Sequence, residues 1–290
     1  MYPGLCESGF HVADSFLNKI SVIVLSLTFL LTACDRHETV VKTIPQQPKS
    51  KSGVSSSVKE EDSEQVKFLQ TKELAEKGDA KAQTLTANNY AVGRGVKVDF
   101  QEAVKWYRRA AEQNEPQAQF NLGYMYYNGE ALPRNYKKAV EWFRKSAEQG
   151  NAGAQGNLGL IYDNGEGVPE DDAMAIKWYR KAALNGYDVA QNSLGFMYQK
   201  GWGVSQNWEE ALKWYLKAAE QGNAVAQSNL GGLYLGGSGV PKDYKTAIKW
   251  FTLAAKQGNA RAQNNLGQMY RKGQGVPQNH KTAVKWYRLA

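Results

Sequence analysis

The chain has 290 residues, and its 42% hydrophobic content is enough to build a continuous core. Its two cysteines, Cys6 and Cys34, are too few for a disulfide framework. Its three histidines, His11, His37 and His280, have no spacing by which they could share a metal ion. The formal net charge is +8, so the chain has an excess of lysine and arginine to place on its surface.

Residues 1–33 have the pattern of a signal peptide. An uncharged run of twelve residues, from Ile20 to Leu31, follows Lys19. The run is too short to cross a hydrocarbon core of about 30 Å as a helix, but its length is typical of the apolar part of a signal peptide. Because the stretch before Lys19 carries two acidic residues and no basic one, we expect translation to begin near Leu17.

The residues 31–34, Leu-Thr-Ala-Cys, resemble the bacterial lipobox. In that motif cleavage precedes the cysteine, whose thiol carries a diacylglycerol, so the resemblance implies that Cys34 anchors the chain in the cell envelope, facing the periplasm. Asp35 resembles a signal for retention in the inner membrane, and the outer membrane is the alternative. Residues 34–62 are rich in Pro, Ser, Lys and Gln, and we expect a disordered tether because they can bury little apolar surface.

A 36-residue period runs through the rest of the chain. Within each unit the apolar residues recur at spacings of three and four, which is the helical period. A unit of this size cannot bury its own apolar face, so neighbouring units must stack. The recurring residues are the tryptophans Trp106, Trp142, Trp178, Trp214, Trp250 and Trp286, the leucines Leu122, Leu158, Leu194, Leu230 and Leu266, and the tyrosines Tyr126, Tyr162, Tyr198, Tyr234 and Tyr270.

Each unit divides into two helices, which we call helix A and helix B. Helix A is expected to end at a glycine, which adopts the left-handed backbone at little cost. Helix B is expected to start at an Asp or Asn, whose side-chain oxygen accepts hydrogen bonds from the first turn. The glycines are Gly129, Gly165, Gly201, Gly237 and Gly273, and the helix-B starts are Asp99, Asn135, Asp171, Asn207, Asp243 and Asn279. Helix B is expected to end at Gly150, Gly186, Gly222 and Gly258, with Asn114 in this role once.

Two recurring positions are expected to lie in the core. On helix B each tryptophan shares a stripe with small alanines, so we expect the indole to fill the space between successive hairpins. On helix A a glycine follows each repeated leucine, as in Leu194-Gly195, and costs about 1 kcal/mol in helix propensity. Its recurrence predicts a close helix crossing that leaves no room for a side chain.

The first unit departs from the pattern. Thr86 stands where the leucine belongs, and Gln70 stands where the tryptophan belongs. We therefore expect residues 63–99 to form a capping helix, at about 63–77, followed by a degenerate repeat, because solenoids need a polar end for solubility. The regular solenoid is expected over residues 100–290.

The residues 118–130, 154–183 and 262–287 resemble the Sel1-like repeat family, a relative of the tetratricopeptide repeats. The resemblance covers about residues 71–290. It implies an all-α fold, a right-handed α-solenoid of stacked αα-hairpins, that holds other proteins without enzymatic activity, cofactor or metal. β-Lactamase or penicillin-binding activity is the alternative, since some cysteine-rich relatives are described in this way; those relatives carry paired cysteines in every repeat, and the repeats of this chain carry none.

The resemblance also implies where a partner binds. In tetratricopeptide-like solenoids helix A lines the concave surface, and an Asn on it holds the backbone of an extended peptide. The corresponding positions are Asn121, Asn157, Ser193, Asn229 and Asn265, and the variable neighbours expected to set specificity are Tyr124, Leu160, Phe196, Gln268 and Lys272. The alternative is that these Asn side chains bond to a neighbouring repeat and only set the curvature. The expected partner is an envelope or host protein.

Lysines and arginines gather on helix B, beside the tryptophans. One interpretation is a solvated outer face with helical ion pairs such as Arg144 with Glu148. The other is a basic ridge for anionic lipid headgroups or an acidic protein. Nucleic acid is not an expected partner of a secreted protein.

Overall fold

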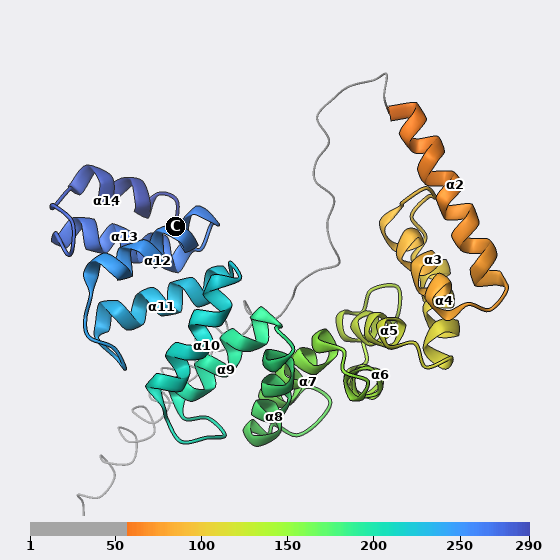
Figure 1. Ribbon diagram of the computed structural model, residues 1–290, viewed down its shortest axis with the longest axis horizontal. Coiled ribbons are helices and arrows are strands. Elements are labelled where there is room, and N and C mark those ends of the chain that lie inside the picture. Colours follow the sequence, from red (N-terminus) through yellow and green to blue (C-terminus); the bar gives the residue numbers. More distant parts are fainter. Residues whose placement is uncertain (1–56) are drawn as a thin grey trace, which may run out of the picture. The chain divides into compact units, whose positions relative to one another are not determined.

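The computed structural model describes residues 57–290, and every regular element in that range is a helix (Figure 1). The helices are α2 (Ser57–Glu76), α3 (Ala80–Val92), α4 (Phe100–Glu112), α5 (Pro116–Asn128), α6 (Tyr136–Glu148), α7 (Ala152–Asn164), α8 (Asp172–Leu184), α9 (Asp188–Lys200), α10 (Trp208–Glu220), α11 (Ala224–Gly236), α12 (Tyr244–Lys256), α13 (Ala260–Lys272) and α14 (His280–Tyr287). The predicted signal peptide, Cys34 and most of the predicted tether lie outside the described residues. Among the helices of residues 57–290, none has both the length and the apolarity needed to cross a membrane.

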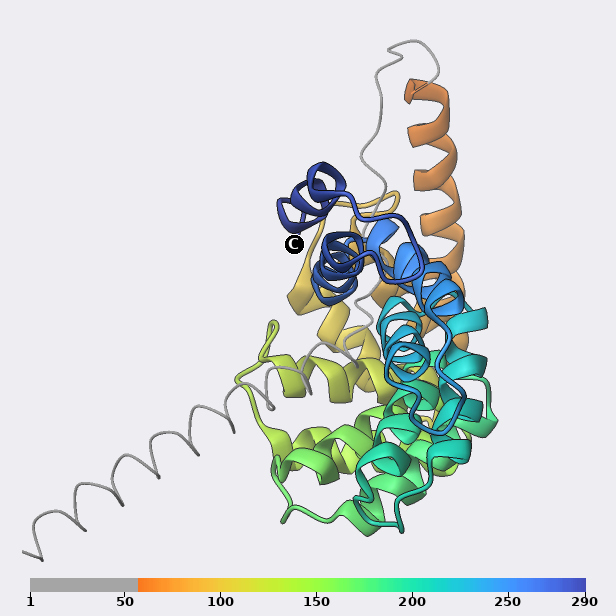
Figure 2. The ribbon, with the colours of Figure 1, turned by 90° about the vertical axis from the view of Figure 1, so that its left-hand side faces the viewer.

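The helices form hairpins that stack in chain order. Helix A is α3, α5, α7, α9, α11 or α13, and helix B is the next even-numbered helix. Each helix packs against the one before it and the one after it, as both views show (Figure 1, Figure 2). The predicted fold, an α-solenoid of stacked αα-hairpins, is confirmed.

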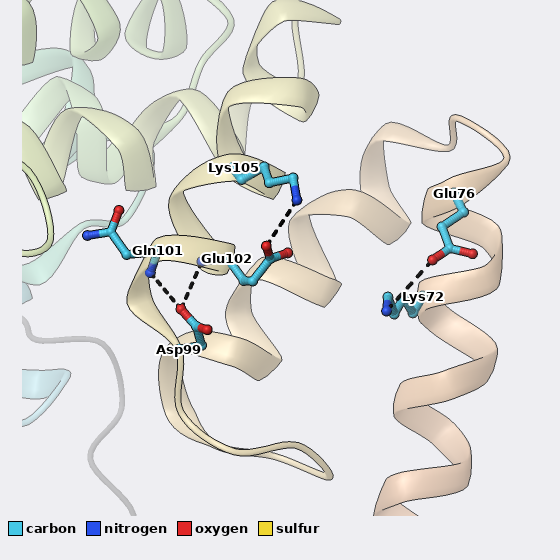
Figure 3. Close-up of polar contacts among 6 residues, drawn as sticks. All are labelled: Lys72, Glu76, Asp99, Gln101, Glu102 and Lys105. Atoms are coloured by element: carbon cyan, nitrogen blue, oxygen red, sulfur yellow. Dashed lines mark hydrogen bonds and ion pairs between the residues drawn. The ribbon is translucent and has the colours of Figure 1, made fainter.

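The predicted helix boundaries are confirmed at both ends of the hairpins. All six predicted Asp and Asn residues cap helix B with the side chain, as Asp99 does by accepting hydrogen bonds from the amides of Gln101 and Glu102 (Figure 3). The glycine after helix A is left-handed in every repeat, with φ between 68° and 79°. At the end of helix B, Asn114 takes the same left-handed geometry as the glycines of the other units, with φ of 67°.

The tryptophan lies in the core, as predicted, in only three of the six repeats. Trp106, Trp178 and Trp214 are buried, whereas Trp142, Trp250 and Trp286 are only partly buried. The fully buried rings belong to the next residue along helix B, which is always Tyr or Phe: Tyr107, Phe143, Tyr179, Tyr215 and Phe251. The indole N–H of Trp214 donates to Glu210, whereas those of Trp106 and Trp178 are buried without a hydrogen-bond partner among the described residues.

The space beside the helix-A glycines is filled by that same buried ring. A Cβ atom added to Gly159 would lie 2.5 Å from the ring of Tyr179, and one added to Gly231 would lie 2.7 Å from the ring of Phe251. The prediction that no side chain fits beside these glycines is therefore confirmed. The close approach is between a ring and a helix backbone, and this contact joins helix A to helix B of each hairpin.

A ladder of buried glutamines joins successive repeats. Gln191 of helix A donates from Nε2 to the carbonyl of Ala183 on the preceding helix B, at 3.1 Å. Its Oε1 accepts a hydrogen bond from Gln221, at the end of the following helix B, at 2.7 Å. The glutamines that occupy this helix-A position are Gln83, Gln119, Gln155, Gln191, Gln227 and Gln263. Each of these carbonyls also accepts a backbone hydrogen bond at the end of its helix, so the glutamine supplies a second donor to a buried acceptor, as at Ala183, which also accepts from the amide of Gly186.

Helix α2 occupies the helix-B place in front of the first repeat. It begins at Ser57, six residues before the predicted start of a capping helix. Phe68 of α2 packs edge-on against Tyr90, and the carbonyl of Ala75 accepts the hydrogen bond from Gln83. The helix thus supplies the apolar contact and the buried acceptor that helix B supplies elsewhere.

Candidate protein-binding face

The predicted Asn positions lie along one side of helix A at different depths. Asn121, Asn157 and Ser193 are buried, whereas Asn229 and Asn265 are partly exposed. A peptide bound along helix A would therefore find the amide groups more accessible in the last two repeats than in the middle of the array.

Two of these asparagines make hydrogen bonds between repeats. Asn121 donates from Nδ2 to Oδ1 of Asn88 in the preceding repeat, at 3.1 Å. Asn229 donates to Oδ1 of Asn192 in the preceding repeat at 3.0 Å, and its own Oδ1 accepts from Arg261 of the next repeat at 3.2 Å. The second interpretation of these residues, as links between repeats, therefore has support at both positions, with side-chain amides as the partners rather than backbone carbonyls.

The predicted specificity positions differ in the surface that they offer. Tyr124 is 8% exposed and Leu160 is 3% exposed, so both contribute mainly to packing between helices. Phe196 is partly exposed, and its ring lies edge-on to that of Trp202, with centroids 5.3 Å apart. Gln268 and Lys272, on α13, are exposed.

Two aromatic rings, one from the repeat before α7 and one from the start of the repeat after it, pack against glycines of α7, a contact that was not predicted from the sequence. Phe120 of α5 lies against Gly153, where an added Cβ would be 3.1 Å from the ring. Tyr187, directly before α9, lies against Gly156, where an added Cβ would be 2.6 Å from the ring. Both glycines belong to α7, so this helix has no side chain at the two positions against which these rings pack.

Tyr187 also breaks the capping pattern. The helix-A N-cap is Asp, Glu or Asn in the other repeats, and its side chain accepts a hydrogen bond there, but Tyr187 makes no such bond. Losing a cap costs about 1 kcal/mol, so the ring has a use other than ending the helix. Burial, followed by the charge of Asp188, raises the pKa of Tyr187 to about 12, so the hydroxyl stays neutral and can donate a hydrogen bond.

We call Phe120, Tyr187, Phe196 and Trp202, which are all partly exposed, the aromatic face. They belong to α5, α9 and the segments next to α9, and they flank α7. Helix α5 carries no charged residue, and α7 carries only Asp163. On α9, by contrast, Asp188 follows Tyr187, and Lys200 lies over the ring of Phe196, 5.4 Å from its centroid. Aromatic residues are enriched at the centres of protein interfaces.

No group of three or more His, Cys, Asp and Glu in the described part of the chain is placed to hold a metal ion. The hydroxyl of Tyr127 donates to Glu166 at 2.7 Å, and burial together with this carboxylate raises the pKa of the tyrosine. A tyrosine held protonated in this way is a structural donor and not a nucleophile.

Family comparison decides the identity of the array. The Sel1 repeat model matches six consecutive segments, at residues 80–115, 116–151, 152–187, 188–223, 224–259 and 260–290. The chain belongs to the Sel1 repeat family. The first matched repeat includes Thr86 and Ala87, where the later ones have Leu and Gly, so the segment that departs from the pattern is part of the Sel1 array.

Two solved Sel1 structures resemble this array. A protective antigen of uropathogenic Escherichia coli strains, described as having this fold, is 39% identical with a TM-score of 0.72, and the match covers 77% of this chain and 48% of the antigen. The chain thus matches about half the length of that relative. A Sel1 repeat protein from Oxalobacter formigenes is 36% identical with a TM-score of 0.69, over 73% of this chain and 85% of the other. None of the curated proteins compared with the chain matches it.

Proposed function

We propose that this Sel1 array is a non-enzymatic scaffold that binds a protein partner on its helix-A side, centred on the aromatic face. The observation that carries the proposal is the pair of rings, Phe120 and Tyr187, that lie against the glycines of α7. Stacking alone does not need them, because other repeats stack with small or polar residues at these positions. Typical Sel1 repeat proteins serve as interaction scaffolds, which agrees with this use of the array.

The partner is an envelope or host protein with an extended segment. Partly exposed Phe196 and Trp202 can take an apolar side chain of that segment. Partly exposed Asn265 can bond its backbone further along the array, since an amide side chain offers both a donor and an acceptor. Asn229 is partly exposed too, but its amide already bonds Asn192 and Arg261. Asn121 and Asn157 are buried, so we assign them to linking the repeats and not to the partner.

We also propose that Cys34 carries a lipid anchor and that the protein is located in the bacterial cell envelope, with the inner membrane favoured by Asp35. Both residues lie outside the part of the chain that the structure describes, and the proposal rests on the lipobox-like residues 31–34 alone. Mass analysis of the N-terminal peptide tests it. A diacylglycerol on Cys34 is the expected result, and an unmodified peptide that continues through residue 34 would contradict it.

The scaffold proposal is tested by crosslinking the chain to its partner in cells that carry it and comparing two variants. Phe196→Ala removes a ring of the aromatic face, and we expect recovery of the crosslinked partner to fall about tenfold, as for an aromatic residue central to an interface. Leu184→Ala is the matched control, because Leu184 is exposed on helix B and does not belong to the aromatic face. Equal recovery with both variants, at unchanged thermal stability, would overturn the assignment.

The β-lactamase alternative has a separate test. Cysteines are absent from residues 57–290, whereas the relatives with that activity carry them in pairs. We expect the full chain to leave a chromogenic β-lactam intact over hours. Turnover above the rate of spontaneous hydrolysis would restore the alternative.

A further inference from the structure

The positive charge of the chain is concentrated in its last two repeats. Residues 242–290 contain ten Lys and Arg against the single acid Asp243, a net charge of +9. Because the whole chain carries +8, residues 1–241 together carry −1. The excess of basic residues is therefore a local property of α12, α13 and α14 rather than of the entire array.

These cations are exposed and have no acidic partners. All ten side chains are exposed, and none of them takes part in an ion pair among the described residues. The one acid, Asp243, caps α12 by accepting hydrogen bonds from Thr246 and from the amide of Lys245. The carboxylate of Asp243 interacts with the first turn of α12. A single negative charge neutralises little of the positive charge on the surrounding surface.

The basic side chains of helix B form two matching stripes. On α12, Lys245, Lys249 and Lys256 recur at spacings of four and seven, which keeps them on one side of the helix. On α14, Lys281 and Lys285 occupy the same positions one repeat later. Since successive repeats stack with the same orientation, the two stripes belong to the same outer side of the array.

Earlier repeats show that the fold does not require these charges. The position of Lys245 and Lys281 is Gln101, Ala173 or Glu209 in three earlier repeats, and the position of Lys256 is Glu112, Glu148 or Glu220. The hairpin forms with either sign of charge. The stripes are consequently a feature of the surface and not of the packing.

Exposed leucines accompany the stripes. In four earlier repeats the third residue after the tryptophan is a cation that covers the indole, as Lys181 covers Trp178 at 4.5 Å. In the last two repeats this residue is Leu253, 38% exposed, and Leu289, 65% exposed. A surface that combines lysines with exposed leucines and partly exposed tryptophans suits the interface of a membrane, where apolar groups enter the headgroup region between basic ones.

We propose that the outer helix-B side of the last two repeats, formed by α12 and α14, binds an anionic phospholipid surface. Seven of the ten cations are lysines, which act as separate point charges and do not converge on one site. An extended sheet of anionic headgroups fits that arrangement better than a single acidic side chain does. This proposal is independent of the protein-binding function and of the lipid anchor, because it uses the opposite helix of each hairpin and no residue before 242.

The direct test is lysine acetylation of the full chain with vesicles of phosphatidylglycerol and phosphatidylcholine, compared with vesicles of phosphatidylcholine alone. We expect labelling of Lys245, Lys249, Lys281 and Lys285 to fall severalfold on the anionic vesicles only. Lysines at the same helix-B positions of earlier repeats provide the internal control and should label equally on both: Lys105, Lys137, Lys177 and Lys213. Equal protection of the two sets, or equal protection by both kinds of vesicle, would overturn the proposal.

A pair of matched variants tests the same surface by binding. Replacing Lys245, Lys249, Lys281 and Lys285 by Gln should lower the ratio of binding to anionic over neutral vesicles about tenfold or more. The control replaces Lys105, Lys137, Lys177 and Lys213 by Gln, which removes the same charge, and should change the ratio less than about twofold. Taking the ratio cancels any binding through the apolar N-terminal segment. If polyglutamate or duplex DNA protects the four lysines as strongly as the vesicles at equal anion concentration, a soluble polyanion replaces the membrane and the proposal fails.

Discussion

Helix α2 and the first repeat differ from the last two repeats in how their charged residues are paired, although all these repeats form the same kind of hairpin. On α4, Lys105 forms an ion pair with Glu102 at 3.0 Å, and on α2, Lys72 pairs with Glu76 (Figure 3). On α12 and α14 the lysines have no acidic partner among the described residues. The ring that follows the tryptophan is nevertheless buried both in α4, where it is Tyr107, and in α12, where it is Phe251. The repeat period thus constrains the core and the helix ends, and leaves the outer surfaces free to acquire different uses.

The strongest way to test this division is to alter two adjacent glycines of α11. Gly231→Leu places a side chain where the ring of Phe251 already lies, 2.7 Å from the added Cβ, and should destabilise the array by about 3 kcal/mol. Gly232→Leu meets nothing within 4 Å and should stabilise α11 by up to about 1 kcal/mol through helix propensity. Denaturant unfolding measures both. Similar changes for the two variants would contradict the ring-on-glycine contact.

The glutamine ladder should matter more in the middle of the array than in its last repeat. Gln191→Met removes two hydrogen bonds, the one to the carbonyl of Ala183, which keeps that from the amide of Gly186, and the one from the side-chain amide of Gln221, and should cost about 2 kcal/mol. Gln263 makes only the first of these bonds, and its buried Oε1 has no partner among the described residues. The variant Gln263→Met should therefore lose about half as much stability. Thermal unfolding of the two variants compares them, and an equal loss would show that the ladder does not join the repeats as described.

The cap of α12 should make stability depend on pH. Hydrogen bonds from Thr246, and then from the amide of Lys245, hold the pKa of Asp243 below its usual value. The stabilisation from this cap is thus present above the unfolded-state pKa and is lost as the pH falls through the lower folded-state value. Asp243→Asn should retain a cap, as Asn207 does for α10, and should lose less stability than the parent between pH 5 and about pH 2. An unchanged pH dependence in the variant would exclude this role of Asp243.

The smallest effects are expected at the exposed lysines themselves. Lys105→Gln removes an exposed helical pair with Glu102 and should cost at most about 0.5 kcal/mol. Lys249→Gln removes a cation that has no acidic partner but lies 5.6 Å from the ring centroid of Trp250, and should change stability by less than about 1 kcal/mol. A loss of more than about 1 kcal/mol for Lys249→Gln would mean that the lysines of α12 serve the fold, against the comparison drawn above.

Much of the fold could be predicted from the sequence because its signals are local. An Asp or Asn caps a helix and a glycine ends one through bonds within a few residues, so the residues at Asp99, Asn207 and Gly165 specified the boundaries directly. The identity of the core ring was less accessible. Trp and the aromatic residue after it recur with the same period, and only the packing shows that the second ring, as in Tyr215, enters the core beside Gly195.

The candidate site was predicted only in outline. The period located the Asn positions, but the burial of Asn157 and the hydrogen bond from Asn121 to Asn88 depend on how neighbouring repeats meet. Tyr187 carried a readable signal, since it interrupts a column of Asp, Glu and Asn caps. What the ring touches could not be deduced in advance, because Gly156 lies 31 residues earlier in the chain and is brought to it by stacking.

The measurement that tests the scaffold account most directly is site-specific photocrosslinking of the full chain in cells that carry it. A photoreactive phenylalanine is placed at Phe196 or Gln268 on helix A, and, as matched positions on helix B, at Leu184 or Leu253, which are exposed. The account predicts protein adducts from the helix-A positions and none of the same mass from the helix-B positions. Adducts from helix B alone, or no protein adduct from either helix-A position, would contradict it.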